Sequence, residues 1–176
     1  MLVETAIILP LLVFLVSGIV EFGMTFREAS TITASTRAGA RMASSMPRQA
    51  GFAQATADAV TSAIQDLPTG EPKELWVYAA NANGYPDSAS SMPSTCTKCV
   101  KFNWNTTTKS FGSPVYNNYP ATGTGGQNAC PGTTDQAGVY VRGVHSEIFP
   151  LFGDRTLTAK TVMRLEPVPS SQTCSG

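Results

Sequence analysis

The chain has 176 residues and a formal net charge of +0 at pH 7, with charged side chains at only 14% of its positions. This length allows one globular domain with its own core, but not two ordinary domains beside a strongly apolar N-terminal segment. A neutral chain lacks the basic surface that attracts nucleic acid, so the composition argues against a nucleic-acid partner.

An apolar helix is the first predicted element. No charged residue interrupts the chain between Glu4 and Glu21, and as a helix this stretch measures about 24 Å, slightly less than the hydrocarbon core of a bilayer. Continuing to Phe26 supplies the missing length but brings Glu21 near the headgroups. A cleavable signal peptide is disfavoured because no basic residue precedes Arg27. We expect a retained membrane-spanning helix.

A less apolar stem, residues 26–45, continues the same helix until Pro47 ends it. The whole helix would have about 40 residues, more than a head of this size can bury. Its small residues recur four apart in two rows, which are Ser35, Gly39 and Ala43, and Ser30, Ala34 and Ala38. Such rows either let helices approach closely in an assembly or lie under the head, and the pattern favours neither.

An α+β head is predicted for residues 47–176, beside an N-terminal helical segment 1–46. Residues 50–67 have the apolar spacing of a second helix. Strands are expected at residues 74–80, 99–104, 138–145 and 157–166, and should form a small, mostly antiparallel sheet. The intervening segments 81–98 and 105–137 are rich in turn-forming residues and read as long loops.

Four cysteines lie in the second half of the chain, and their even number favours two disulfides in an oxidising compartment. The spacing leaves all three connectivities open. A zinc site is the alternative, since one close pair has ligand spacing, but a second close pair is missing. The cysteines are Cys96, Cys99, Cys130 and Cys174.

The location of the head follows from two opposed signals. Arg27, Arg37 and Arg41 follow the apolar helix, and the positive-inside rule would keep the remainder of the chain in the cytoplasm. Disulfides require the opposite side of the membrane. The two agree if a basic leader precedes Met1 and is cleaved, so we expect such a leader.

Three groups of motifs follow one another along the chain. The first is Glu4 with the ILPLL core and the GIVEFG run at residues 18–23, and the second is AGARMAS at residues 38–44. The third comprises VYVR, FPLF and LTAKTVMRLE within residues 139–166. Together they resemble the TadE-like pseudopilins of tight-adherence (Tad, type IVc) pili. The resemblance implies a pilin-like helical stem, and processing and assembly by a prepilin peptidase, a cytoplasmic ATPase and an inner-membrane platform.

The resemblance also implies roles for residues of the apolar helix. Glu4 would pair with the N-terminal ammonium of a neighbouring subunit, or lie at the membrane interface where the helix dipole favours it. The carboxylate is fifth after the cleaved glycine in the family, so one mature residue precedes Met1 or the register differs. Glu21 would mark the outer edge of the bilayer or pair with an arginine such as Arg27 of another subunit. The remaining assembly residues expected are Ile7, Pro10, Leu11, Phe14 and Gly18, of which Pro10 should loosen the first turns.

No catalytic motif is recognisable. The single histidine, His145, falls in a predicted strand without a nucleophile motif, and no phosphate-binding or calcium loop is present. We expect no enzyme activity, no cofactor and no metal.

Two functions fit the sequence. The first is a structural pilin or pseudopilin that waits in the inner membrane and then polymerises, alone or with other pilins, into an extracellular adhesive filament. The second is a monomeric, membrane-anchored extracellular binding module, whose loops would capture a ligand.

Overall fold

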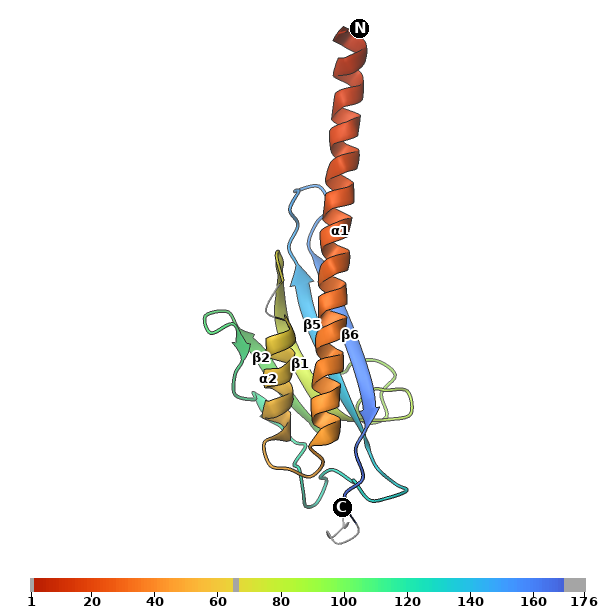
Figure 1. Cartoon of the computed structure of the whole chain (residues 1–176), viewed down its shortest axis with the longest axis vertical. Coiled ribbons are helices and arrows are strands. Elements are labelled where there is room, and N and C mark those ends of the chain that lie inside the picture. Colours follow the sequence, from red (N-terminus) through yellow and green to blue (C-terminus); the bar gives the residue numbers. More distant parts are fainter. Residues whose placement is uncertain (1, 65–66, 170–176) are drawn as a thin grey trace.

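A single long helix dominates the structure, a computed structural model that describes residues 2–64 and 67–169, with side chains from Thr5 onward. Helix α1 (Leu2–Ser45) continues without a break through Pro10 and ends two residues before Pro47. Its second half packs on the head, whereas its first half projects beyond it (Figure 1). The predicted long N-terminal helix is therefore confirmed, and Pro10 does not interrupt it.

Helix α2 (Phe52–Ile64) runs back alongside α1. It begins later than the predicted residue 50 because Gly51 has a φ of 85°, a left-handed conformation that ends the connection from α1. The buried face of α2 consists of Phe52, Thr56, Ala57, Val60, Thr61 and Ile64. The prediction of an amphipathic second helix is confirmed for these residues.

The strands form one antiparallel sheet with the order β3-β2-β1-β5-β6, and β4 pairs with β2. All four predicted strands are present, and two short ones lie inside the segment expected to be a loop. The strands are β1 (Gly70–Ala80), β2 (Cys99–Asn105), β3 (Ser110–Phe111), β4 (Tyr116–Asn117), β5 (Gln136–His145) and β6 (Arg155–Arg164).

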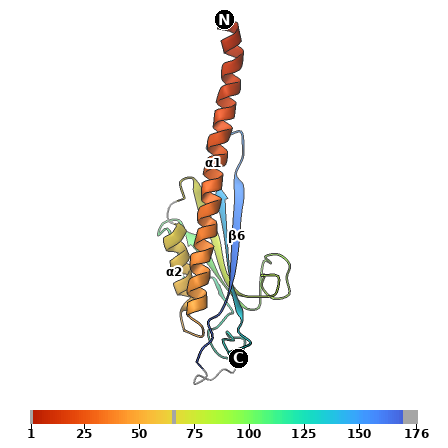
Figure 2. The same ribbon diagram turned by 45° about the vertical axis from the view of Figure 1, so that its right-hand side comes forward.

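Both helices cover the same face of the sheet (Figures 1 and 2). The core between them contains Ile32 of α1, Val60 of α2 and Val139 of β5, each almost fully buried. A Cβ atom added at Gly39 would lie 2.5 Å from Val60 Cγ2 and 3.2 Å from Val139 Cγ1. Because Gly39 lacks a side chain, α1 lies close to both elements. The second half of α1 is thus part of the head's core.

A smaller buried cluster joins β1 to the start of β2. Buried Trp76 and Tyr78 of β1 pack with Cys96 and Cys99, which form a disulfide with Cα atoms 5.9 Å apart. One of the two expected disulfides is therefore present. Cys174 lies outside the described residues, so a bond between Cys130 and Cys174 stays a prediction.

Candidate functional site: the exposed helix and its buried polar cluster

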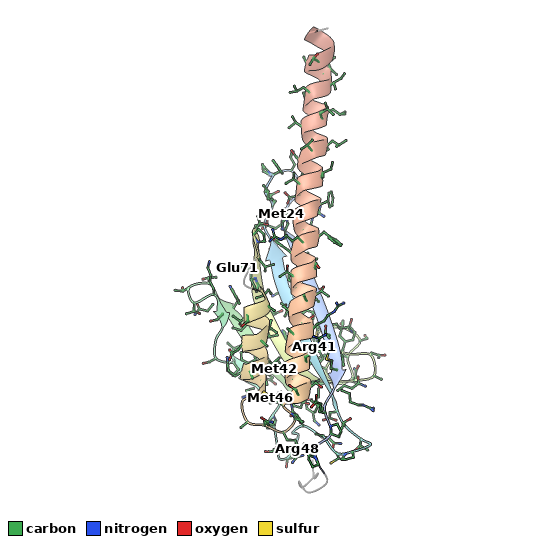
Figure 3. The ribbon with its side chains drawn as sticks, in the orientation of Figure 1. Met24, Arg41, Met42, Met46, Arg48 and Glu71 are labelled. Carbon is green, nitrogen blue, oxygen red and sulfur yellow. A yellow bond between two sulfur atoms is a disulfide. The ribbon has the colours of Figure 1, made fainter. Side chains whose placement is uncertain are left out.

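The first half of α1 exposes apolar side chains on all sides. The exposed fraction of these side chains runs from 71% at Ile7 to 43% at Val20, so almost all of this apolar stretch of the helix lies outside the core. Figure 3 shows these side chains standing around the helix above the head. A core helix of a soluble protein would be covered, so this segment suits a membrane or a bundle of helices. The exposed set includes the expected assembly residues Ile7, Leu11 and Phe14.

The two rows of small residues on the stem point in different directions. Ser35, Gly39 and Ala43 are buried against the head. Ser30 and Ala34 are exposed, and they line a shallow hollow with Phe26 and Arg37. The first row therefore serves packing within the subunit, and the second is the row still open to another helix.

A buried polar cluster joins α1 to the end of β5. His145 Nε2 lies 3.0 Å from Glu21 Oε1, and His145 Nδ1 lies 2.9 Å from Glu28 Oε2. All three side chains are at most 1% exposed. We call Glu21, His145 and Glu28 the polar cluster.

Backbone and hydroxyl donors complete the hydrogen bonding of both carboxylates. Glu28 Oε1 accepts hydrogen bonds from the Thr69 N–H (2.9 Å), the Thr69 hydroxyl (2.7 Å) and the Gly70 N–H (2.8 Å). Glu21 Oε2 accepts from the N–H groups of Ile148 (3.1 Å) and Phe149 (3.4 Å). Burying a carboxylate costs folding free energy unless it has hydrogen-bond partners, and these N–H and hydroxyl groups are the partners of Glu28 and Glu21.

The charge state of His145 follows from its surroundings. Burial by itself lowers the pKa of the imidazole, but hydrogen bonds to Glu28 and Glu21 and the charges of both carboxylates outweigh burial and raise the pKa. When the ring is protonated, Nδ1–H donates to Glu28 and Nε2–H donates to Glu21, so one side chain of β5 links two positions of α1. Both ring nitrogens are occupied, which suits a structural histidine and not a catalytic one.

Glu21 has a partner within its own chain that the sequence did not indicate. Its carboxylate contacts His145, and its place at the outer edge of the bilayer or beside an arginine of another subunit stays a prediction. Sequence patterns also gave no role to Glu28 and Thr69. The sequence does indicate that the two carboxylates lie close together, because Glu21 and Glu28 are seven residues apart and therefore on one face of a helix. No sequence pattern connects that face with His145.

An aromatic contact continues the polar cluster toward the N-terminus. Phe152, in the turn between β5 and β6, lies with its ring centroid 6.0 Å from that of Phe14 and 6.2 Å from that of Phe22. The guanidinium carbon of Arg155 lies 4.7 Å from the Phe22 ring centroid. A Cβ added at Gly18 would lie 3.7 Å from Phe152, so Gly18 faces this turn.

Two tyrosines of the segment 105–137 have defined contacts in the fold. Tyr119 is 1% exposed and packs edge-on against Phe52, and the Tyr116 hydroxyl donates to the Cys96 carbonyl at 2.8 Å. Tyr119 therefore packs its loop against α2, and Tyr116 of β4 holds the loop that contains Cys96. Within residues 5–64 and 67–169, no group of three or more His, Cys, Asp or Glu side chains could hold a metal ion.

Comparison with known proteins identifies the N-terminal segment. Residues 1–41 match the family model described as TadE-like protein. The match covers the exposed apolar segment and most of the stem, and it ends before α2. No curated protein and no solved structure matches the chain.

Proposed function

We propose that this chain, a TadE-like protein by its first 41 residues, is a pilin or pseudopilin subunit of a Tad-like type IV pilus. The subunit is held in the inner membrane by the apolar half of α1. It is then packed, with copies of itself or with other pilins, into an extracellular filament that serves adhesion.

The observation that carries this proposal is the exposure of the first half of α1. Each large apolar side chain from Ile7 to Val20 remains at least 43% exposed in the described part of the chain. Burying one such side chain fully stabilises by about 1.5–3 kcal/mol, so the segment strongly favours lipid or neighbouring helices over water. A pilin uses both environments in turn. A TadE-like segment fits this role, since the family is a structural pilus component and not an enzyme family.

Glu4 would set the register of assembly. Its side chain lies outside the described residues, so its pairing with the N-terminal ammonium of a neighbour rests on the family resemblance. A buried pair of this kind adds little net stability, but a wrong register leaves a charge unpaired at a cost of several kcal/mol. Glu4 therefore selects one arrangement of subunits over others.

The assembly machinery follows from the same family. A prepilin peptidase would remove the leader, and a cytoplasmic ATPase and an inner-membrane platform would drive polymerisation. The long head favours a minor subunit, because major tight-adherence pilins are usually much shorter.

Glu4→Ala, compared with Glu166→Ala in the head, tests the assembly role. Both chains should enter the membrane, but only the Glu4→Ala chain should be missing from filaments sheared from the native host. Electron microscopy and mass spectrometry of the sheared fraction give the readout. Filaments that form normally with Glu4→Ala would remove Glu4 from the proposal, and a wild-type chain that is never found in filaments would overturn it.

A monomeric, membrane-anchored binding module is the alternative, and one feature favours it. An apolar hollow lies between the start of α2 and the sheet, lined by Phe52, Val100, Phe102, Pro114 and Tyr119. Sedimentation of the purified chain in detergent separates the two functions, since a binding module stays monomeric at every concentration. Self-association that depends on the exposed face of α1 supports the pilin.

A further inference from the structure

The β5–β6 hairpin ends in an apolar tip, residues 148–152, that lies beside the apolar half of α1 (Figure 1). Phe152 packs on Phe14 and Phe22. Phe149 lines a hollow whose other walls belong to α1, namely Leu9, Leu12, Val13, Val16, Ser17 and Val20. The tip therefore follows α1 well into the segment that would cross the membrane.

The length of the helix places the tip at membrane depth. A hydrocarbon core of about 30 Å takes up about 20 helical residues, which from Thr5 reach about Met24. Phe14 and Phe22 both fall inside this interval, and Phe152 touches both. If the membrane ended before the tip, at Val13, it would cover only about 14 Å of helix. A bilayer that accommodates α1 must therefore accommodate the tip.

The outer side of the tip suits lipid. Leu151 is 68% exposed and Ile148 is 39% exposed, and both are large and apolar. Charged residues flank the tip, with Glu147 before it and Asp154 and Arg155 after it. An apolar run between charged residues matches acyl chains at its centre and headgroups at its ends.

The N–H groups of the turn meet one part of the requirement that lipid imposes on the backbone. Irregular backbone is tolerated at membrane depth only where its polar groups have protein partners. Each N–H from residue 146 to residue 153, Pro150 excepted, has one. Ser146 donates to Thr69 O, Glu147 to Asp154 Oδ1, Ile148 and Phe149 to Glu21, Leu151 and Phe152 to Phe149 O, and Gly153 to Glu147 Oε2.

We propose that the hairpin tip, residues 148–152, inserts beside α1 into the outer leaflet and that lipid acyl chains are its partner. Glu21 holds the tip against α1 through its hydrogen bonds with Ile148 and Phe149. The inserted tip and α1 together hold the head in one orientation on the membrane. This inference rests on the proposed membrane stage of the subunit.

Depth-dependent quenching tests the insertion. The full chain is placed in phosphatidylcholine–phosphatidylglycerol vesicles whose acyl chains carry bromine at mid-depth. Leu151→Trp reports on the tip, and Leu12→Trp reports on α1. Val115→Trp replaces an apolar residue of the β3–β4 loop with 60% exposure and is the matched control. The wild-type chain, with Trp76 and Trp104 in the head, gives the background.

The fluorescence that Leu151→Trp and Leu12→Trp add to the wild-type background should be quenched by the brominated lipid. The fluorescence that Val115→Trp adds should not be quenched. Quenching of Leu12→Trp without Leu151→Trp overturns the insertion of the tip while the membrane stage stands. Loss of quenching at both positions overturns the membrane stage as well. A Leu151→Trp signal shielded from bromine only at high protein-to-lipid ratio identifies a second copy as the partner and also overturns the proposal.

Discussion

Glu21 and His145 are 124 residues apart in the chain, yet Glu21 Oε1 and His145 Nε2 lie 3.0 Å apart and both side chains are buried. Glu28 binds the other ring nitrogen at 2.9 Å. The contact joins the helix that would enter the membrane to the end of strand β5. Any displacement of the helix relative to the head must break it, so α1 and the head should move as one body.

The stability of the chain should fall as pH rises above about 6.5. The pKa of His145 is raised in the folded state, so its contribution is full below the ordinary value of 6.5 and is lost as pH passes the raised value. Each tenfold gain in the proton affinity of the folded state is equivalent to about 1.4 kcal/mol. Thermal unfolding of the detergent-solubilised chain between pH 6 and 9 measures this loss.

His145→Gln provides the control for the pH dependence, because the chain has one histidine. At pH 6 the variant should be less stable by about 3–5 kcal/mol, since it leaves two buried carboxylates without their cation, and this difference should shrink as pH rises. Its melting temperature should change less with pH than that of the wild type. Parallel pH profiles of the two chains would contradict a protonated His145.

Glu28→Ala should lower the free energy of unfolding by about 3–5 kcal/mol. The change removes one partner of a buried ion pair and leaves the N–H groups of Thr69 and Gly70 unpaired. Urea denaturation followed by tryptophan fluorescence measures the effect. Glu166→Ala, at an exposed carboxylate, should change stability by no more than about 0.5 kcal/mol.

A double variant tests whether Glu28 acts through His145. Glu28→Ala combined with His145→Gln should cost less than the sum of the two single changes, because contacting residues couple by about 0.5–3 kcal/mol. Additive losses would show that the two residues stabilise the fold independently.

Gly39→Leu and Ala34→Leu should distinguish the role of the buried face of the stem from that of its exposed face. Gly39→Leu places a side chain against Val60 and Val139 and should destabilise the head by about 1–3 kcal/mol or more. Ala34→Leu lies on the exposed row and should leave the melting temperature unchanged. If the exposed row packs in filaments, Ala34→Leu should reduce filament yield in the native host, and an unchanged yield would exclude that role.

Replacing Cys96 and Cys99 together by Ser should cost about 2 kcal/mol, the loop-closure value for so short a loop. Thermal unfolding with and without reductant gives the measurement. Peptide mapping under non-reducing conditions should also show a Cys130–Cys174 cross-link. Recovery of both cysteines as free thiols from protein secreted by the native host would refute the second disulfide.

Local patterns in the sequence determined most of the fold. The uncharged run of residues 5–20 and the alanine-rich stem predicted one long helix, and the apolar spacing of residues 50–67 predicted α2. Alternation predicted the four main strands. Periodicity and turn residues act over a few neighbours, so they can be read without knowledge of the rest of the chain.

Only the tertiary structure decided the partners of those elements. No sequence pattern pairs Glu21 with His145, and it is sheet register and the placement of α1 that bring Glu21 to His145 and to the β5–β6 turn. The same packing decided that Gly39 faces the head while Ala34 faces outward. Contacts across more than a hundred residues depend on how whole elements pack against each other, and no local pattern encodes that geometry.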